Sequence, residues 1–135
     1  MERDTRSRKW LITINNPDQK GFSHDRIKIL LAEFGSNALY WCMSDEIGES
    51  GTPHTHIYFA LQNAARFSTV KRRFEGSHID MANGTSQQNR DYVFKEGKWL
   101  KDKKAETNLP ETHEEYGEMP VERQGARSDL ADLYD

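Results

Sequence analysis

The fold is decided by residues 39–61, LYWCMSDEIGESGTPHTHIYFAL. Two runs rich in aromatic and other apolar residues, 39–46 and 53–61, flank a short loop that contains Gly48 and Gly51. Runs of this composition between turn residues are typical of β-strands, and a short connection favours antiparallel pairing. The stretch therefore predicts an antiparallel β-hairpin.

Strands and helices are expected to alternate on both sides of this hairpin. Before it, residues 10–15 (WLITIN) predict a strand that ends at the turn signal Asn16-Pro17, and apolar residues at helical spacing predict a helix over 24–34. The elements expected after it are a short helix over 67–74, a strand over 77–82, a helix over 85–96 that opens with a capping box, and a short strand at 99–100. This order predicts an α+β fold, with a central, mostly antiparallel five-stranded sheet and helices on one face.

Charge and composition divide the chain near Lys101. Residues 1–101 carry a net charge of +3, whereas residues 102–135 carry −6 and lose the apolar periodicity. We therefore expect one domain over 1–101 and an acidic tail or linker over 102–135. No run approaches the roughly 18 apolar residues of a membrane span, so no membrane partner is expected. The one cysteine, Cys42, excludes a disulfide framework and favours a reducing compartment.

Titratable residues gather on one face of the predicted sheet. Because strand side chains alternate between faces, the face opposite the apolar one is expected to hold Glu46, His54, His56, His78 and Asp80. Burying so many titratable groups without a purpose would be costly. The pattern therefore indicates a functional site.

A His-x-His pair in a strand can chelate a metal ion. His54 and His56 should stand about 7 Å apart at Cα on the same side of the strand, with Glu46 near them on the partner strand. Two imidazoles and one carboxylate leave open coordination positions, as a catalytic site needs, and suit Mn²⁺ better than Mg²⁺. Two half-exposed surface histidines are the simpler interpretation. Asp45 is an alternative third ligand, although the alternation favours Glu46.

Tyr92 and Lys95 are three residues apart on one predicted helix and should share a face. Tyrosine can act as a covalent nucleophile, but its ordinary pKa of about 10 makes it weak without help. A metal ion and the Lys95 ammonium would both favour the phenolate. The alternative is a tyrosine at the edge of the core beside a solvated lysine.

Several polar and basic residues are candidates for nucleic-acid contact. Asn15 and Asn16 end a strand and either touch DNA or make a turn. Arg66, Lys71 and Arg72 belong to a basic cluster that either contacts phosphates or forms a solvated helix face. The charge pattern does not distinguish these alternatives.

Three segments resemble, in order and spacing, the motifs of a known superfamily. ITINNP at 12–17, PHTH at 53–56 and DYVFK at 91–95 are similar to motifs I, II and III of the replication-initiator (Rep) proteins of circular single-stranded DNA viruses and related plasmids, which are HUH endonucleases. SQQNRDYVFKEG at 86–97 resembles circovirus-type members, and the complete His-x-His resembles geminivirus and nanovirus-like ones. The resemblance covers about residues 9–100.

The resemblance implies a role for each matching residue. Glu46, His54 and His56 would bind divalent Mn²⁺ or Mg²⁺, and Tyr92 would be the single nucleophile with Lys95 as its helical companion. The implied fold is a central antiparallel sheet like that of RNA-recognition domains. The candidate DNA contacts are Asn15, Asn16, Arg66, Lys71, Arg72 and Gln88.

The implied activity is nicking and rejoining of single-stranded DNA at the stem-loop of a rolling-circle replication origin, through a 5′-phosphotyrosine. The rivals are a non-catalytic module that binds single-stranded nucleic acid and a metal-dependent hydrolase in which water attacks. Thr55 departs from the family pattern, in which the middle residue of the triplet is bulky and apolar; its side chain should face the core.

Full-length Rep proteins also carry a helicase domain, but the phosphate-binding loop G-x-x-x-x-G-K-[ST] is absent from this sequence. We therefore expect the nuclease domain, with the acidic tail leading toward a helicase domain. GARSDL at 125–130 resembles the segment that follows the nuclease in Rep proteins. Rep proteins often form homo-oligomers. A viral protein of this kind would act in the host nucleus, and a plasmid protein in the cytoplasm of the plasmid-bearing cell.

Overall fold

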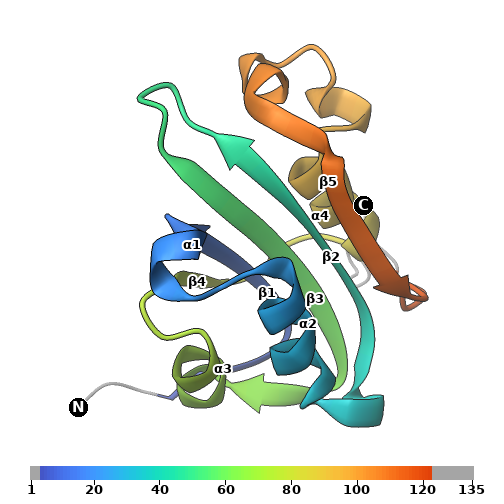
Figure 1. Cartoon of the computed structure of the whole chain (residues 1–135). Helices are drawn as coiled ribbons and strands as arrows, with labels where there is room; N and C mark the ends of the chain where they lie inside the picture. Colours follow the sequence, from blue (N-terminus) through green and yellow to red (C-terminus); the bar gives the residue numbers. More distant parts are fainter. Residues whose placement is uncertain (1–3, 123–135) are drawn as a thin grey trace.

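In the computed structural model, which describes residues 4–122, five strands form one antiparallel sheet in the order β4-β1-β3-β2-β5 (Figure 1). The strands are β1 (Arg6–Asn15), β2 (Ala38–Ile47), β3 (Pro53–Arg66), β4 (His78–Met81) and β5 (Asn108–Gly117). The helices are α1 (Pro17–Lys20), α2 (His24–Ala32), α3 (Phe67–Arg73) and α4 (Ser86–Phe94), with 3-10 turns at Gly35–Asn37, Gly97–Trp99 and Lys103–Thr107. The predicted α+β fold with a five-stranded sheet is confirmed. None of the helices in the described part is long and apolar enough to span a membrane.

The predicted hairpin lies at the centre of this sheet. β2 and β3 pair with Glu46 opposite His54 and Ser44 opposite His56. The Gly48 amide donates to the Thr52 carbonyl at 2.9 Å and closes the loop. Because β3 also pairs with β1 along its length, it is hydrogen-bonded on both sides. This double pairing fixes the positions of its side chains firmly.

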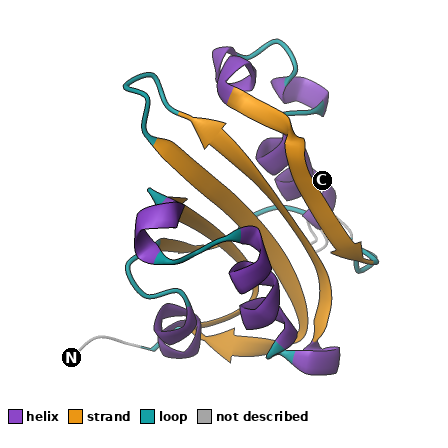
Figure 2. Cartoon of the chain, in the orientation of Figure 1, coloured by secondary structure: helices purple, strands orange, loops and turns teal. Residues whose placement is uncertain are grey.

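Helices cover both faces of the sheet, so the expectation of helices on one face is wrong (Figure 2). On one face, Trp10, Phe59 and their neighbours pack against α2 and α3. On the other face, a smaller apolar cluster packs against α4, and its members are Tyr40, Cys42, Tyr58, Ala60, Val93 and Phe94. The half of the second face that lies away from the hairpin loop carries this apolar cluster, and the cluster needs a helix to exclude water.

The fifth strand is not where the sequence predicted it. Residues 99–100 do not form a strand; Trp99 ends a 3-10 turn and Leu100 is exposed. The fifth strand is β5, which pairs with β2 inside the segment expected to be a tail. Its sequence, NLPETHEEYG, is acidic and contains a proline, as edge strands often do. Residues 125–130, which resemble the segment after the nuclease, lie outside the described residues.

One histidine ties α2 to the edge of the sheet. His24 Nε2 lies 2.9 Å from Asp45 Oδ1, and His24 Nδ1 lies 2.6 Å from Glu114 Oε2 on β5. Lys28 Nζ donates to the second oxygen of Glu114 at 2.7 Å. The hydrogen bond to Asp45, with that to Glu114, raises the pKa of His24 against the effect of burial. The His24 side chain therefore joins α2, β2 and β5.

This pairing predicts a pH-dependent contribution to stability. Since the pKa of folded His24 is raised, its contribution is fully present below the unfolded value of about 6.5 and is lost as pH rises through the folded value. His24→Gln should lower the free energy of unfolding by roughly 1 kcal/mol at pH 6 and by less at pH 9. Urea unfolding measures this, with Glu114→Gln as the second arm of a double-mutant cycle. A loss of equal size at both pH values would contradict the assignment.

Candidate active site

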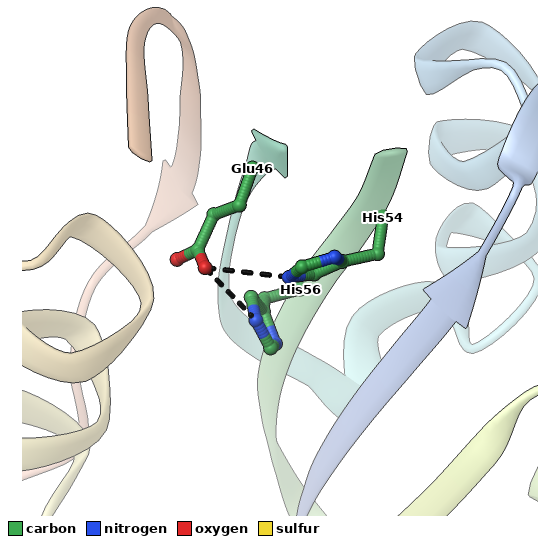
Figure 3. Close-up of side chains that lie close together, drawn as sticks. All are labelled: Glu46, His54 and His56. Carbon is green, nitrogen blue, oxygen red and sulfur yellow. Dashed lines mark hydrogen bonds and ion pairs between the residues drawn. The ribbon is translucent and has the colours of Figure 1, made fainter. Parts of the chain in front are cut away.

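Three metal-ligating side chains converge where the β2–β3 hairpin approaches its loop (Figure 3). One ligand atom each from Glu46, His54 and His56 lie within 4.8 Å of one another. His54 Nε2 is 3.3 Å and His56 Nε2 is 3.5 Å from the same carboxylate oxygen, Glu46 Oε1. A nitrogen–nitrogen–oxygen set on one side fits a divalent metal ion and leaves its other positions for water or substrate. The group could hold a metal ion.

The other acidic and histidine candidates do not join this group. Asp45 points to the opposite face, where it accepts hydrogen bonds from Thr55 Oγ1 at 2.7 Å and from His24. Thr55 is buried on that face, as expected. His78 and Asp80 share the face of the site, but they are exposed on the edge strand β4 and pair with each other at 3.0 Å. Of the two candidate third ligands, Glu46 therefore lies beside the two histidines and Asp45 does not.

Glu46 is a buried carboxylate surrounded by donors. Burial would raise its pKa, but hydrogen bonds from His54, His56 and Lys95 outweigh burial and hold the pKa well below its ordinary value. Lys95 Nζ lies 2.7 Å from Glu46 Oε2, and both side chains are nearly inaccessible. Burial lowers the pKa of His56, which favours the neutral imidazole that a metal ion requires. The alternative of a solvated Lys95 is wrong.

Lys95 reaches Glu46 because it ends helix α4. It is the C-cap residue, with a left-handed backbone (φ 55°), and its Nζ donates to the Tyr92 carbonyl at 2.6 Å. The same ammonium lies 3.9 Å from the centroid of the Tyr92 ring. Tyr92 and Lys95 are thus brought together, as their spacing predicted, although Lys95 lies over the ring face.

The Tyr92 ring lies between His56 of the Glu46–His54–His56 group and Trp99. Its ring centroid is 5.5 Å from that of His56 and 5.2 Å from that of Trp99, both in edge-to-face geometry. Burial raises the pKa of Tyr92, and the charge of Glu46 raises it further. The Lys95 ammonium is paired with Glu46 Oε2, and the expectation that a metal ion and Lys95 together favour the phenolate stays a prediction.

Five of the six predicted DNA-contact residues fall into two separate regions, and the sixth, Gln88, lies on helix α4. Asn15 lies directly opposite His54, and the Asn16 amide donates to the Pro53 carbonyl at 2.8 Å, so both are at the metal-ligand end of the sheet. Arg66, Lys71 and Arg72 are exposed at the far end of β3 and on α3. That end is about 40 Å away along the strand path. The structure does not bring the basic cluster to the site.

A groove runs from Tyr92 across the neighbouring surface. Its volume is about 680 Å³, and its lining includes Leu11, Met81, Asn83, Gln88, Tyr92 and Trp99. Gln88 also closes the predicted capping box, since its Oε1 accepts from the Thr85 amide at 2.8 Å. The groove joins apolar and aromatic walls to amide groups, and its lining also holds the charged residues Asp80, Asp91 and Lys98. Such a lining suits a partly apolar, hydrogen-bonding ligand.

Three residues of the site were missed by the sequence analysis. Thr13 Oγ1 is 3.3 Å from His56 Nδ1, and strand alternation could have placed Thr13 on this face. Ser44 and Asn108 lie beside Glu46, with Asn108 Nδ2 donating to Ser44 Oγ and to Glu46 Oε2 at 3.2 Å each. Asn108 begins β5, which the sequence did not predict, so no signal indicated its place.

Comparison with known proteins shows the family. Residues 7–96 match the family model described as "Putative viral replication protein". The chain is 32% identical over 98 residues to the replication-associated protein of Pigeon circovirus, covering 73% of this chain and 29% of that protein. It is 32% identical over 126 residues to that of Porcine circovirus 2, covering 92% and 34%. The master replication protein of Banana bunchy top virus is 26% identical over 87 residues, covering 64% and 27%.

The chain spans about a third of the length of the relatives it matches. The family match includes β1, both strands of the central hairpin and helix α4, and thus every residue from Asn15 to Lys95 discussed as a site candidate. This chain belongs to the viral replication protein family, as a circovirus-like member that matches the N-terminal region of replication-associated proteins.

Proposed function

We propose that this chain nicks and rejoins single-stranded DNA at a replication origin, with Tyr92 as the nucleophile beside a divalent metal ion held by Glu46, His54 and His56. The observation that carries this proposal is the edge-to-face packing of the Tyr92 ring on His56 at 5.5 Å. It brings a hydroxyl-bearing side chain next to a buried set of metal ligands. The names of the viral relatives, replication-associated protein and master replication protein, support a role in DNA replication.

In the proposed reaction, the Tyr92 oxygen attacks the scissile phosphorus and the bond to the 3′-oxygen breaks. The phenol loses its proton, and the leaving 3′-oxygen gains one. A bound metal ion would supply Lewis-acid polarisation of the phosphate. The product is a 5′-phosphotyrosine that retains the bond energy, so a later 3′-hydroxyl can reverse the step without ATP. Nicking and joining thus need one tyrosine.

We assign Lys95 an electrostatic role. Its ammonium is fixed against Glu46 at 2.7 Å and over the Tyr92 ring, so it needs little movement to offset charge that develops near the tyrosine oxygen. Fixed charges in a water-poor site are more effective than mobile ones, because no reorganisation is needed during the reaction. Mn²⁺ or Mg²⁺ is the proposed metal ion.

The groove beside Tyr92 is the proposed path of the single strand. Trp99 and Leu11 provide surfaces on which bases can stack or pack, and base stacking on aromatic side chains tolerates any sequence. Gln88 in the groove, with Asn15 and Asn16 at the metal-ligand end, provides hydrogen-bonding groups. The distant Arg66, Lys71 and Arg72 are proposed to contact backbone phosphates of the origin stem.

Because the relatives are longer than the matched region, nicking would be one of several activities of the full-length protein. We propose that a helicase domain follows the acidic segment, that copies of the protein assemble, and that it acts in the host nucleus. These proposals rest on the resemblance to Rep proteins and on the coverage of the relatives.

Metal binding should stabilise the fold by an amount that rises with the logarithm of the metal-ion concentration above Kd. At a Mn²⁺ concentration of 100 times Kd, the free energy of unfolding should rise by about 2.7 kcal/mol. His54→Ala and His56→Ala should each abolish the rise, and EDTA should reverse it in the wild type. His78→Ala, on the same face but exposed, is the matched control and should retain the full effect. Thermal unfolding with and without Mn²⁺ measures this; equal stabilisation of all four proteins would place the metal ion elsewhere.

Removal of the Tyr92 phenol oxygen should abolish covalent catalysis. Wild-type protein mixed with Mn²⁺ and dye-labelled single-stranded origin loops should give a labelled protein band on a denaturing gel. Tyr92→Phe should lose the band entirely and remain folded, whereas Tyr116→Phe, at an exposed tyrosine on β5, should keep it. Cleavage by wild-type protein without a labelled band would indicate attack by water. Binding without cleavage across the panel of loops would indicate a non-catalytic module.

A further inference from the structure

Asn108, the first residue of β5, is a buried amide placed between β2 and α4. Its Nδ2 lies 3.2 Å from each of three oxygens: Glu46 Oε2, Ser44 Oγ and the Val93 carbonyl. Its Oδ1 lies 2.6 Å from His113 Nε2. One side chain therefore contacts the strand that carries Glu46 and the helix that carries Tyr92.

The surrounding groups determine which way this amide points. The Ser44 hydroxyl donates to the Val93 carbonyl at 2.5 Å, so Ser44 Oγ is an acceptor toward Asn108. Three acceptors on one side require the amide nitrogen there. On the other side, His113 Nε2–H donates to Oδ1, and the imidazole is held flat against Phe94, with ring centroids 4.1 Å apart and planes 10° apart. His113 thus locks the orientation of the amide.

The amide also helps to fix the orientation of the Glu46 carboxylate relative to the histidines. Asn108 and Lys95 both donate to Oε2, at 3.2 and 2.7 Å. Oε1 is left toward His54 and His56. Groups that orient the ligands of a metal ion commonly change its affinity although they do not touch it.

We infer that Asn108 is a positioning residue that fixes the Glu46 carboxylate and the spacing between β2 and α4, so that the metal ligands and Tyr92 stay in register. The inference rests on the proposed function. It assigns to β5, an edge strand of the sheet, a direct influence on the site. His113 acts one step further out, through the amide.

The test is Mn²⁺ affinity, measured by electron paramagnetic resonance on the whole chain. Asn108→Leu keeps the branched shape of the side chain but removes its amide donors and acceptor, and it should weaken Mn²⁺ binding about 10- to 100-fold. His113→Ala leaves the Asn108 amide free to rotate and should weaken Mn²⁺ binding less than Asn108→Leu does. Asn37→Ala is the control, because Asn37 also exchanges two hydrogen bonds, with the main chain of Asn63, in an exposed region. It should bind Mn²⁺ as the wild type does.

A second measurement separates positioning from general destabilisation. At saturating Mn²⁺, the rate at which the covalent Tyr92–DNA adduct forms should also fall in Asn108→Leu. Asn37→Ala should keep the wild-type rate even if its thermal stability is lower. Wild-type affinity and rate in a folded Asn108→Leu would overturn the inference and leave the proposed function intact. If Asn108→Leu does not fold, unchanged affinity in His113→Ala overturns it. A wild type that binds no Mn²⁺ would overturn both.

Discussion

The buried carboxylate of Glu46 is the constraint on which the site depends. A lone charge at this depth would be strongly unfavourable, and the surrounding structure supplies Lys95, Asn108 and two imidazoles to balance it. Lys95 reaches Glu46 from the C-cap of α4, where its backbone is left-handed, and Tyr92 in the last turn of the same helix packs against His56. One helix end thus contributes to the charge balance of Glu46 and sets the position of Tyr92.

The architecture explains why this arrangement forms at the hairpin. β3 is paired on both sides, so His54 and His56 project from a rigid strand, and β2 holds Glu46 opposite them. Near the other end of the same face, apolar residues bind α4 and exclude water. The site therefore lies at the border between a dry helix–sheet contact and the open groove. In the proposed function, this border is where a metal ion and a single strand of DNA both reach Tyr92.

The position of Tyr92 at this border affects the pKa of its hydroxyl. Burial and the Glu46 charge raise the pKa of Tyr92, while Lys95 lies over the ring and is paired with Glu46. In the proposed function, a bound metal ion would counter this effect by favouring the phenolate.

The sequence by itself determined the hairpin, the two helices predicted over 24–34 and 85–96, and the convergence of Glu46, His54 and His56, because strand alternation and helical spacing are local rules. In the structure these helices span 24–32 and 86–94. Only the tertiary structure decided the rest. β5 is acidic and contains a proline, and it forms a strand because β2 offers a free edge and His24 and Lys28 hold Glu114. Asn108 and the Lys95–Glu46 ion pair join residues far apart in the chain, and a contact of that kind leaves no periodic signal in the sequence.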